Sequence, residues 1–189
     1  MNNLTIYTES NPNPNSLKFV VNSMLVDEGI VKDYANVQST IDSPLAKKLF
    51  DFPFVKRVFI MNNFITITKE EKNSWSEIKI ELSGFIKKYI EEGNDIIKIS
   101  STPSPKKFIS KTTNIDNQIK QILDEYIKPA VEQDGGAINF ESFNDGKVLV
   151  SLKGSCSGCP SSTITLKSGI ENLLKRFIPE VKEVIAEEL

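Results

Sequence analysis

Four short, largely apolar stretches in the first half of the chain predict β-strands, and in the first of them hydrophobic and polar residues alternate. These stretches are residues 4–8, 17–21, 55–60 and 64–68. Two prolines and three asparagines in residues 11–15 predict a rigid turn between the first two strands. Asn62-Asn63 predicts a hairpin turn between the last two. Residues 23–39 follow no clear pattern, and we expect them to be irregular.

Two helices are predicted in the same half. Ser43-Pro44 combines an N-cap residue with a first-position proline, which predicts a short helix through Phe50. Residues 74–77 (Ser-Trp-Ser-Glu) have the spacing of a capping box, and Gly93-Asn94 is expected to end the helix that follows. The apolar stripe of this helix is interpreted as core and consists of Trp75, Ile78, Leu82, Phe85 and Tyr89.

The second half predicts the order helix, strand, strand, helix, strand. Residues 115–126 have amphipathic helical spacing, Pro129 is expected to kink this helix, and Asp134-Gly135-Gly136 is expected to end it. Strands are predicted at 138–140 and 148–152 around a turn at 144–146, with a last strand at 181–186. The buried stripe of the intervening helix is predicted to be Thr163, Leu166, Ile170, Leu173 and Phe177.

The stretch between the two halves is rich in Ser, Thr, Pro and Lys, which predicts a flexible linker. We therefore expect an α+β protein of two small domains, residues 1–96 and 114–189, joined by a linker at 97–113. Each domain should contain a small, mainly antiparallel or mixed sheet packed with helices.

Composition excludes several classes of function. The 23 basic and 25 acidic residues nearly balance, so no basic surface for nucleic acid is indicated, and the absence of histidine excludes His-based catalysis. Residues 114–189 carry 8 basic and 12 acidic residues, which leaves a net charge of +2 on residues 1–113. No apolar run has the length of a membrane span, and no targeting signal is recognised, so we expect a cytoplasmic protein.

The candidate chemistry lies in residues 154–162, which hold both cysteines of the chain, Cys156 and Cys159. Two thiolates at this spacing can bind one metal ion or one edge of an iron–sulfur cluster. Pro160 places both before the next helix, whose N-terminus is expected to lower their pKa values. A dithiol oxidoreductase using the same pair is the main alternative, and a zinc-bridged dimer is a third hypothesis.

Two sets of motifs resemble a known family. Residues 134–136, 154–162, Gly169 and 179–181 resemble the NifU C-terminal (Nfu) domain, and the resemblance covers residues 114–189. Residues 11–19, 43–50 and 64–69 resemble the N-terminal domain often joined to Nfu, over residues 4–92. The second resemblance implies no catalytic residue.

The resemblance implies a carrier that binds a [4Fe-4S] cluster, or alternatively a [2Fe-2S] cluster, through Cys156 and Cys159 and passes it to apo-proteins. Its partners would be iron–sulfur client proteins and upstream cluster-assembly proteins, without enzymatic turnover, nucleic acid or membrane. A cluster normally takes four protein ligands, and this chain offers two thiols and no imidazole. Oxygen from Glu132 or Asp134 matches iron–sulfur centres poorly, so a second protomer is expected to complete the ligand set in a two-fold dimer.

Limited proteolysis tests the predicted linker. We expect the first cuts to fall between Ser100 and Lys111, because few residues there can bury apolar surface. Mass spectrometry of the fragments locates the cuts. Early cleavage inside residues 115–189, with 100–111 left intact, would contradict the two-domain organisation.

Overall fold

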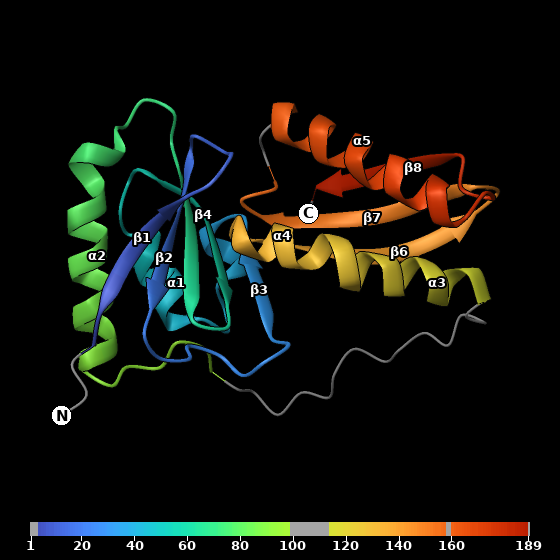
Figure 1. Cartoon of the computed structure of the whole chain (residues 1–189). Helices are drawn as coiled ribbons and strands as arrows, with labels where there is room; N and C mark the ends of the chain where they lie inside the picture. The colour runs from blue at the N-terminus through green and yellow to red at the C-terminus, as the bar shows by residue number, and fades with distance from the viewer. Residues whose placement is uncertain (1–3, 99–113, 158–159, 189) are drawn as a thin grey trace. The chain divides into compact units, whose positions relative to one another are not determined.

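The computed structural model describes residues 4–98, 114–157 and 160–188, and the chain divides into two compact units, residues 1–100 and 101–189. Each unit combines one β-sheet with helices (Figure 1), which confirms the expected α+β class. Residues 99–113 of the predicted linker lie outside the described residues. Within the described ranges, no helix has a stretch long and apolar enough to cross a bilayer.

The first unit is built on a five-stranded antiparallel sheet in the order β1-β2-β5-β4-β3. Strands β1 and β3 therefore form its two edges. The turn at residues 11–15 joins β1 to β2, and Asn62, at a φ of 49°, joins β4 to β5 as the sequence predicts. The strands are β1 (Ile6–Ser10), β2 (Ser16–Val21), β3 (Val31–Tyr34), β4 (Val55–Met61) and β5 (Phe64–Lys69).

Two helices, α1 (Pro44–Leu49) and α2 (Trp75–Glu91), supply apolar side chains to the core of this unit. Alternate residues of β2, β4 and β5 meet them, because successive side chains of a strand point to opposite faces. Burying each large apolar side chain stabilises the fold by about 1.5–3 kcal/mol. Trp75 belongs to this packing: its ring lies edge-on to Phe19, and its indole N–H donates to the carbonyl of Pro14 at 3.0 Å.

Two expectations for the first unit are wrong. Residues 23–39 contain the edge strand β3 and a 3₁₀ turn, η1 (Val37–Ser39). The strand escapes pattern recognition because Lys32 and Asp33 interrupt its apolar residues, and Asp33 is held by Arg57 across the sheet at 2.7 and 2.9 Å. The predicted capping box is not formed, since the Ser74 hydroxyl pairs with that of Ser76 and makes no cap hydrogen bond.

The second unit contains a three-stranded sheet in the order β6-β7-β8. Strands β6 (Gly136–Asn144) and β7 (Lys147–Gly154) form an antiparallel hairpin around Asp145-Gly146, and β8 (Glu183–Glu188) pairs with β7 in parallel. The helices are α3 (Asn114–Ile122), the π-helical segment η2 (Leu123–Ile127), α4 (Lys128–Gln133) and α5 (Pro160–Phe177). The break expected at Pro129 takes the form of this π-helical turn just before it.

The predicted buried stripe of α5 is partly wrong. Ile170 and Leu174 are fully buried, Leu166 packs at the edge of the core, and Phe177 is 53% exposed. The buried face thus runs through positions four residues apart and continues into Ile178. Phe177 stacks instead on Tyr126 of η2, with ring centroids 5.7 Å apart. Packing in the folded unit therefore buries Leu174, which the predicted stripe did not include, and leaves Phe177 outside the core.

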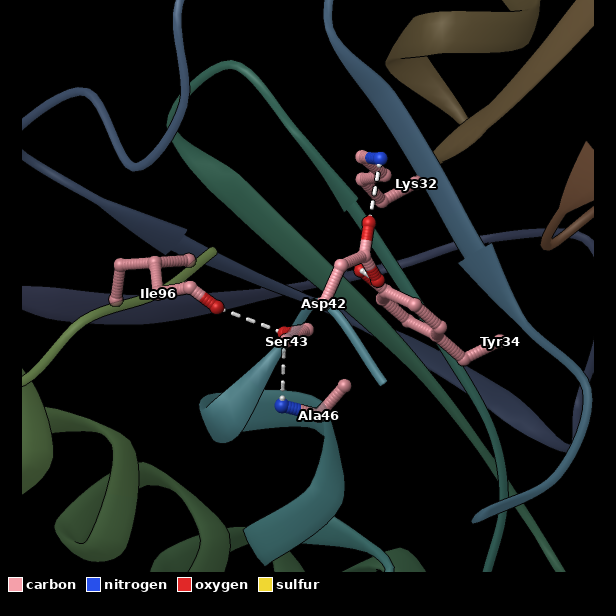
Figure 2. A network of polar contacts seen from close by, with 6 residues as sticks. All are labelled: Lys32, Tyr34, Asp42, Ser43, Ala46 and Ile96. Atoms are coloured by element: carbon pink, nitrogen blue, oxygen red, sulfur yellow. Dashed lines mark hydrogen bonds and ion pairs between the residues drawn. The ribbon is translucent and has the colours of Figure 1, made fainter. Parts of the chain in front are cut away.

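A polar network joins distant parts of the first unit (Figure 2). The carboxylate of Asp42 accepts from Lys32 Nζ at 2.6 Å and from the Tyr34 hydroxyl at 3.0 Å, and its carbonyl accepts from the Lys98 N–H at 2.7 Å. Ser43 caps α1 through the Ala46 N–H at 3.1 Å and donates to the carbonyl of Ile96 at 2.7 Å. The network therefore fastens β3, the start of α1 and the residues after α2 to one another.

Burial acts to raise the pKa of Asp42, but the hydrogen bonds from Lys32 and Tyr34 outweigh it and hold the pKa below its ordinary value. Burial, with the neighbouring carboxylate, raises the pKa of Tyr34, so the phenol stays protonated and can donate. A carboxylate whose pKa is lowered in the folded state stabilises the fold above its unfolded pKa of about 4. This stabilisation is lost as the pH falls through the folded pKa.

We expect Asp42→Asn to lower the free energy of unfolding of the first unit at pH 7 by about 1 kcal/mol. Hydrogen bonds to charged groups contribute about 1.5–3 kcal/mol, and partial exposure of the pair reduces this. The loss should shrink below about pH 4. Fluorescence of Trp75, the single tryptophan, follows denaturant unfolding of this unit. The control Asp51→Asn removes an exposed ion pair with Lys48 and should have little effect; an equal loss in both variants would contradict the prediction.

Candidate metal centre

Cys156 lies in the loop between β7 and α5, as the sequence predicts. Its side chain is only 8% exposed and belongs to the core cluster of the second unit, together with Ile138, Leu152 and Ile170. Cys159, the other predicted ligand, lies outside the described residues. Cys156 therefore lies in the loop that the sequence predicts, but its side chain is packed into the core of the unit.

The Gly135-Gly136 turn lies directly against this cysteine. Gly135 has a φ of 80°, a conformation that favours glycine, and it turns the chain from α4 into β6. A Cβ atom added at Gly136 would lie 2.9 Å from Cys156 Sγ and 2.7 Å from the carbonyl oxygen of Lys153. No side chain fits at residue 136, and the absence of a side chain allows the backbone to cover the sulfur.

Three hydrogen bonds position the cysteine loop at the end of the β6–β7 hairpin. The Ser155 N–H donates to the carbonyl of Gly135 at 3.3 Å, which links the loop to the glycine turn. The Ser157 hydroxyl donates to the carbonyl of Leu152 at 2.9 Å, and its N–H donates to the carbonyl of Gly154 at 3.1 Å. Sequence reasoning assigned no role to these serines, although a serine on each side of Cys156 is visible in the sequence.

Burial raises the pKa of the Cys156 thiol to about 11; a contact with Ser155 opposes this, and the charge of Asp134 adds to it. The expected lowering by the helix N-terminus is therefore wrong for Cys156, because loss of solvent dominates. At neutral pH the thiol is protonated in this conformation. Binding of a metal cargo must release that proton, which metal coordination itself drives.

Two roles are open to Cys156, metal ligand and redox nucleophile. Both require the thiolate, and burial of Cys156, which raises its pKa, opposes that form. Within the described ranges, no three Cys, Asp or Glu side chains gather into a group that could hold a metal ion. A metal or cluster held by Cys156 therefore needs further ligands from Cys159, from another molecule, or from both.

Comparisons with known proteins agree with both halves of this description. Residues 6–93 match the model of the Nfu/NifU scaffold protein N-terminal domain, and residues 119–185 match the NifU-like domain. The chain is 39% identical over 180 residues to the human "NFU1 iron-sulfur cluster scaffold homolog, mitochondrial", covering 95% of this chain and 70% of that protein. The chain therefore belongs to the Nfu family of NifU-like scaffold proteins.

Two further proteins are similar to this chain. The protein of the same name from Drosophila willistoni is 39% identical over 179 residues, which cover 95% of this chain and 62% of that protein. The chain thus spans less than two thirds of the length of that relative. The solution structure of a NifU-like protein from Saccharomyces cerevisiae is 30% identical, with a TM-score of 0.47, and the match covers 51% of this chain and 87% of that one. The relatives named here as NFU1 homologues are mitochondrial, whereas the cytoplasmic location of this chain stays a prediction.

We expect Gly136→Ala to destabilise the second unit by about 1–3 kcal/mol, because its Cβ would overlap a backbone carbonyl and the Cys156 sulfur. Amide hydrogen exchange of β6 and β7 measures the loss. Gly169→Ala in α5 is the matched control, since its Cβ would meet no atom within 4 Å and alanine favours a helix. Equal protection of β6 and β7 in both variants would show that the close contact at Gly136 does not matter.

Proposed function

We propose that this chain is an iron–sulfur cluster scaffold or carrier that holds its cargo on Cys156 and Cys159. The proposal is carried by the position of Cys156, whose sulfur lies against Gly136, where no side chain fits. The match of both halves of the chain to the Nfu family supports it. The cargo would be a [4Fe-4S] cluster, with a [2Fe-2S] cluster as the alternative. Two protomers would share it in a two-fold dimer, each contributing two thiolates.

Transfer to an apo-protein is a ligand exchange. A client thiol attacks one iron, loses its proton, and displaces the Cys156 or Cys159 thiolate, which takes up a proton as it leaves. The burial of Cys156 in the metal-free chain favours release of the cluster to the client, because the released thiol returns to an apolar site where the protonated form is preferred. No bond is made or broken in a substrate other than the cargo, so the role is that of a carrier and not of an enzyme.

Partners follow from this role. Upstream cluster-assembly proteins would load the chain, and apo iron–sulfur proteins would unload it. We propose the cytoplasm as the compartment, where thiols stay reduced.

The test compares the oligomeric state and metal content of the apo and reconstituted full-length chain. We expect an apo monomer and a holo dimer by size-exclusion chromatography with light scattering, with iron and sulfide in equal amounts. Cys156→Ser and Cys159→Ser should each abolish the cluster and the dimer, because each removes two of the four ligands per dimer. Serine is preferred to alanine at 156, since Cys156 is part of the core and a cavity would confuse the result. Ser168→Ala, at an exposed site on α5, is the control.

Three outcomes would reject the proposal. A holo-protein that stays monomeric without added thiol excludes the shared cluster. Zinc in place of iron and sulfide supports the zinc-bridged dimer instead. Reduction of insulin disulfides by the metal-free chain, lost in both cysteine variants, supports the dithiol oxidoreductase.

A further inference from the structure

A groove runs along the first unit between the edge strand β1 and helix α2, which lie side by side in Figure 1. Its volume is about 500 Å³. Residues 4–8 form one wall, and α2 supplies the other through Lys79, Ile80, Ser83, Gly84 and Lys87. The groove belongs entirely to the first unit, so it is separate from the cysteine site.

The β1 wall offers backbone groups that can pair with another strand. β1 is an edge of the sheet, and the Asn22 N–H donates to the carbonyl of Thr5 at 3.2 Å, so Thr5 faces β2. Antiparallel pairing alternates along a strand, so Tyr7 also faces β2, and the N–H and C=O groups of Ile6 and Thr8 point away from the sheet. Such an edge is a template for an added strand.

The α2 wall combines open space with an exposed apolar side chain. A Cβ atom at Gly84 would meet no atom within 4 Å, so packing inside the chain does not require glycine there. Glycine inside a helix nevertheless costs about 1 kcal/mol relative to alanine. Ile80, one turn earlier, is 74% exposed. Glycine at 84 leaves the space beside it open, and Ile80 adds an apolar side chain to the α2 wall.

The charge of the groove indicates the chemistry of its occupant. Lys79 and Lys87 are the charged residues among those that line it, with no acidic side chain in the lining that the structure describes. Lys87 lies 3.8 Å from Glu91, but both side chains are nearly half exposed, so this pair is weak. Residues 99–113 of this chain contain three lysines and no acidic residue, so their charge opposes binding here.

We propose that this groove binds an extended acidic segment of a partner protein, which adds to β1 as a sixth strand. The spacing of Lys79 and Lys87 defines the sequence motif of the bound segment. These lysines are eight helical residues apart, which is about 12 Å, and four residues of an extended strand span nearly the same length, about 13 Å. Two acidic residues four positions apart on one face of the added strand each meet a lysine, and an apolar residue midway between them lies opposite Ile80 and Gly84.

The probe is a fluorescein-labelled peptide with Glu-Thr-Val-Thr-Glu at its centre and Ser-Gly at both ends, added to the full-length metal-free chain. Fluorescence anisotropy should show saturable binding that weakens with salt. Amide NMR signals of Ile6 and Thr8 should shift on binding. The same peptide with Lys in place of both Glu residues should bind at least about tenfold more weakly.

Two pairs of matched variants separate the groove from general charge and stability effects. K79E/K87E should weaken binding about tenfold or more, whereas K56E/K72E changes net charge equally at exposed sites outside the groove and should leave affinity within about twofold. Gly84→Trp should fill the groove and weaken binding about tenfold or more, whereas Gly84→Ala leaves space and should retain it. Trp75 fluorescence is replaced by circular dichroism as the check of folding, because Gly84→Trp adds a second indole.

The proposal is overturned if binding is absent up to about 1 mM peptide, if both lysine pairs weaken it equally, or if Gly84→Trp binds as the wild type does. Hydrogen exchange without peptide identifies other occupants. Protection of the Ile6 and Thr8 amides that grows with protein concentration would assign the groove to a second copy. Protection at every concentration would assign it to residues 99–113. Because the apo chain is used, failure here leaves the cluster proposal standing, and failure of the cluster proposal leaves this one standing.

Discussion

The candidate site depends on one steric constraint, the contact between the backbone at Gly136 and the sulfur of Cys156. It positions the end of α4 against the end of β7, and the hydrogen bond from Ser155 to Gly135 holds the two together. Because β6 begins at this contact and pairs with β7, with a bulge between Phe140 and Ser142, the contact ties the cysteine loop to the start of β6. Any side chain at residue 136 would have to displace either the sulfur or a strand carbonyl.

The same contact gives Cys156 two opposing properties. As a member of the core it contributes to packing, and its burial favours the protonated thiol. In the proposed role of ligand it would have to lose its proton, and metal coordination would supply the free energy for that step. The apolar site would accept the protonated thiol again on release.

The two units differ in what they contain. The second carries Cys156 in the loop after β7, and the sequence of the first contains no cysteine. In the first unit, the Asp42 network connects the region of edge strand β3 to the residues after α2. The other edge strand, β1, borders a groove lined by two lysines. A scaffold that holds cargo at one place and recognises partners at another can use the same cargo site for several recipients.

The sequence by itself determined the elements whose signals are local. Several features were predictable because each has a signal in neighbouring residues. They are the strands β2, β4 and β5, the Ser43-Pro44 start of α1, the Asp145-Gly146 turn and the position of Cys156 before a proline-initiated helix. The tertiary structure alone decided the rest. Strand β3 forms because charged residues find partners far along the chain, and α5 buries Leu174 and exposes Phe177 because of its packing in the folded unit. The Cys156 pKa rises above the value expected from a helix N-terminus because the Gly135-Gly136 turn, twenty residues away in the chain, helps to exclude water from the sulfur. A sequence pattern reports periodicity and local conformation, whereas the exclusion of solvent from a side chain depends on what packs against it in the folded unit.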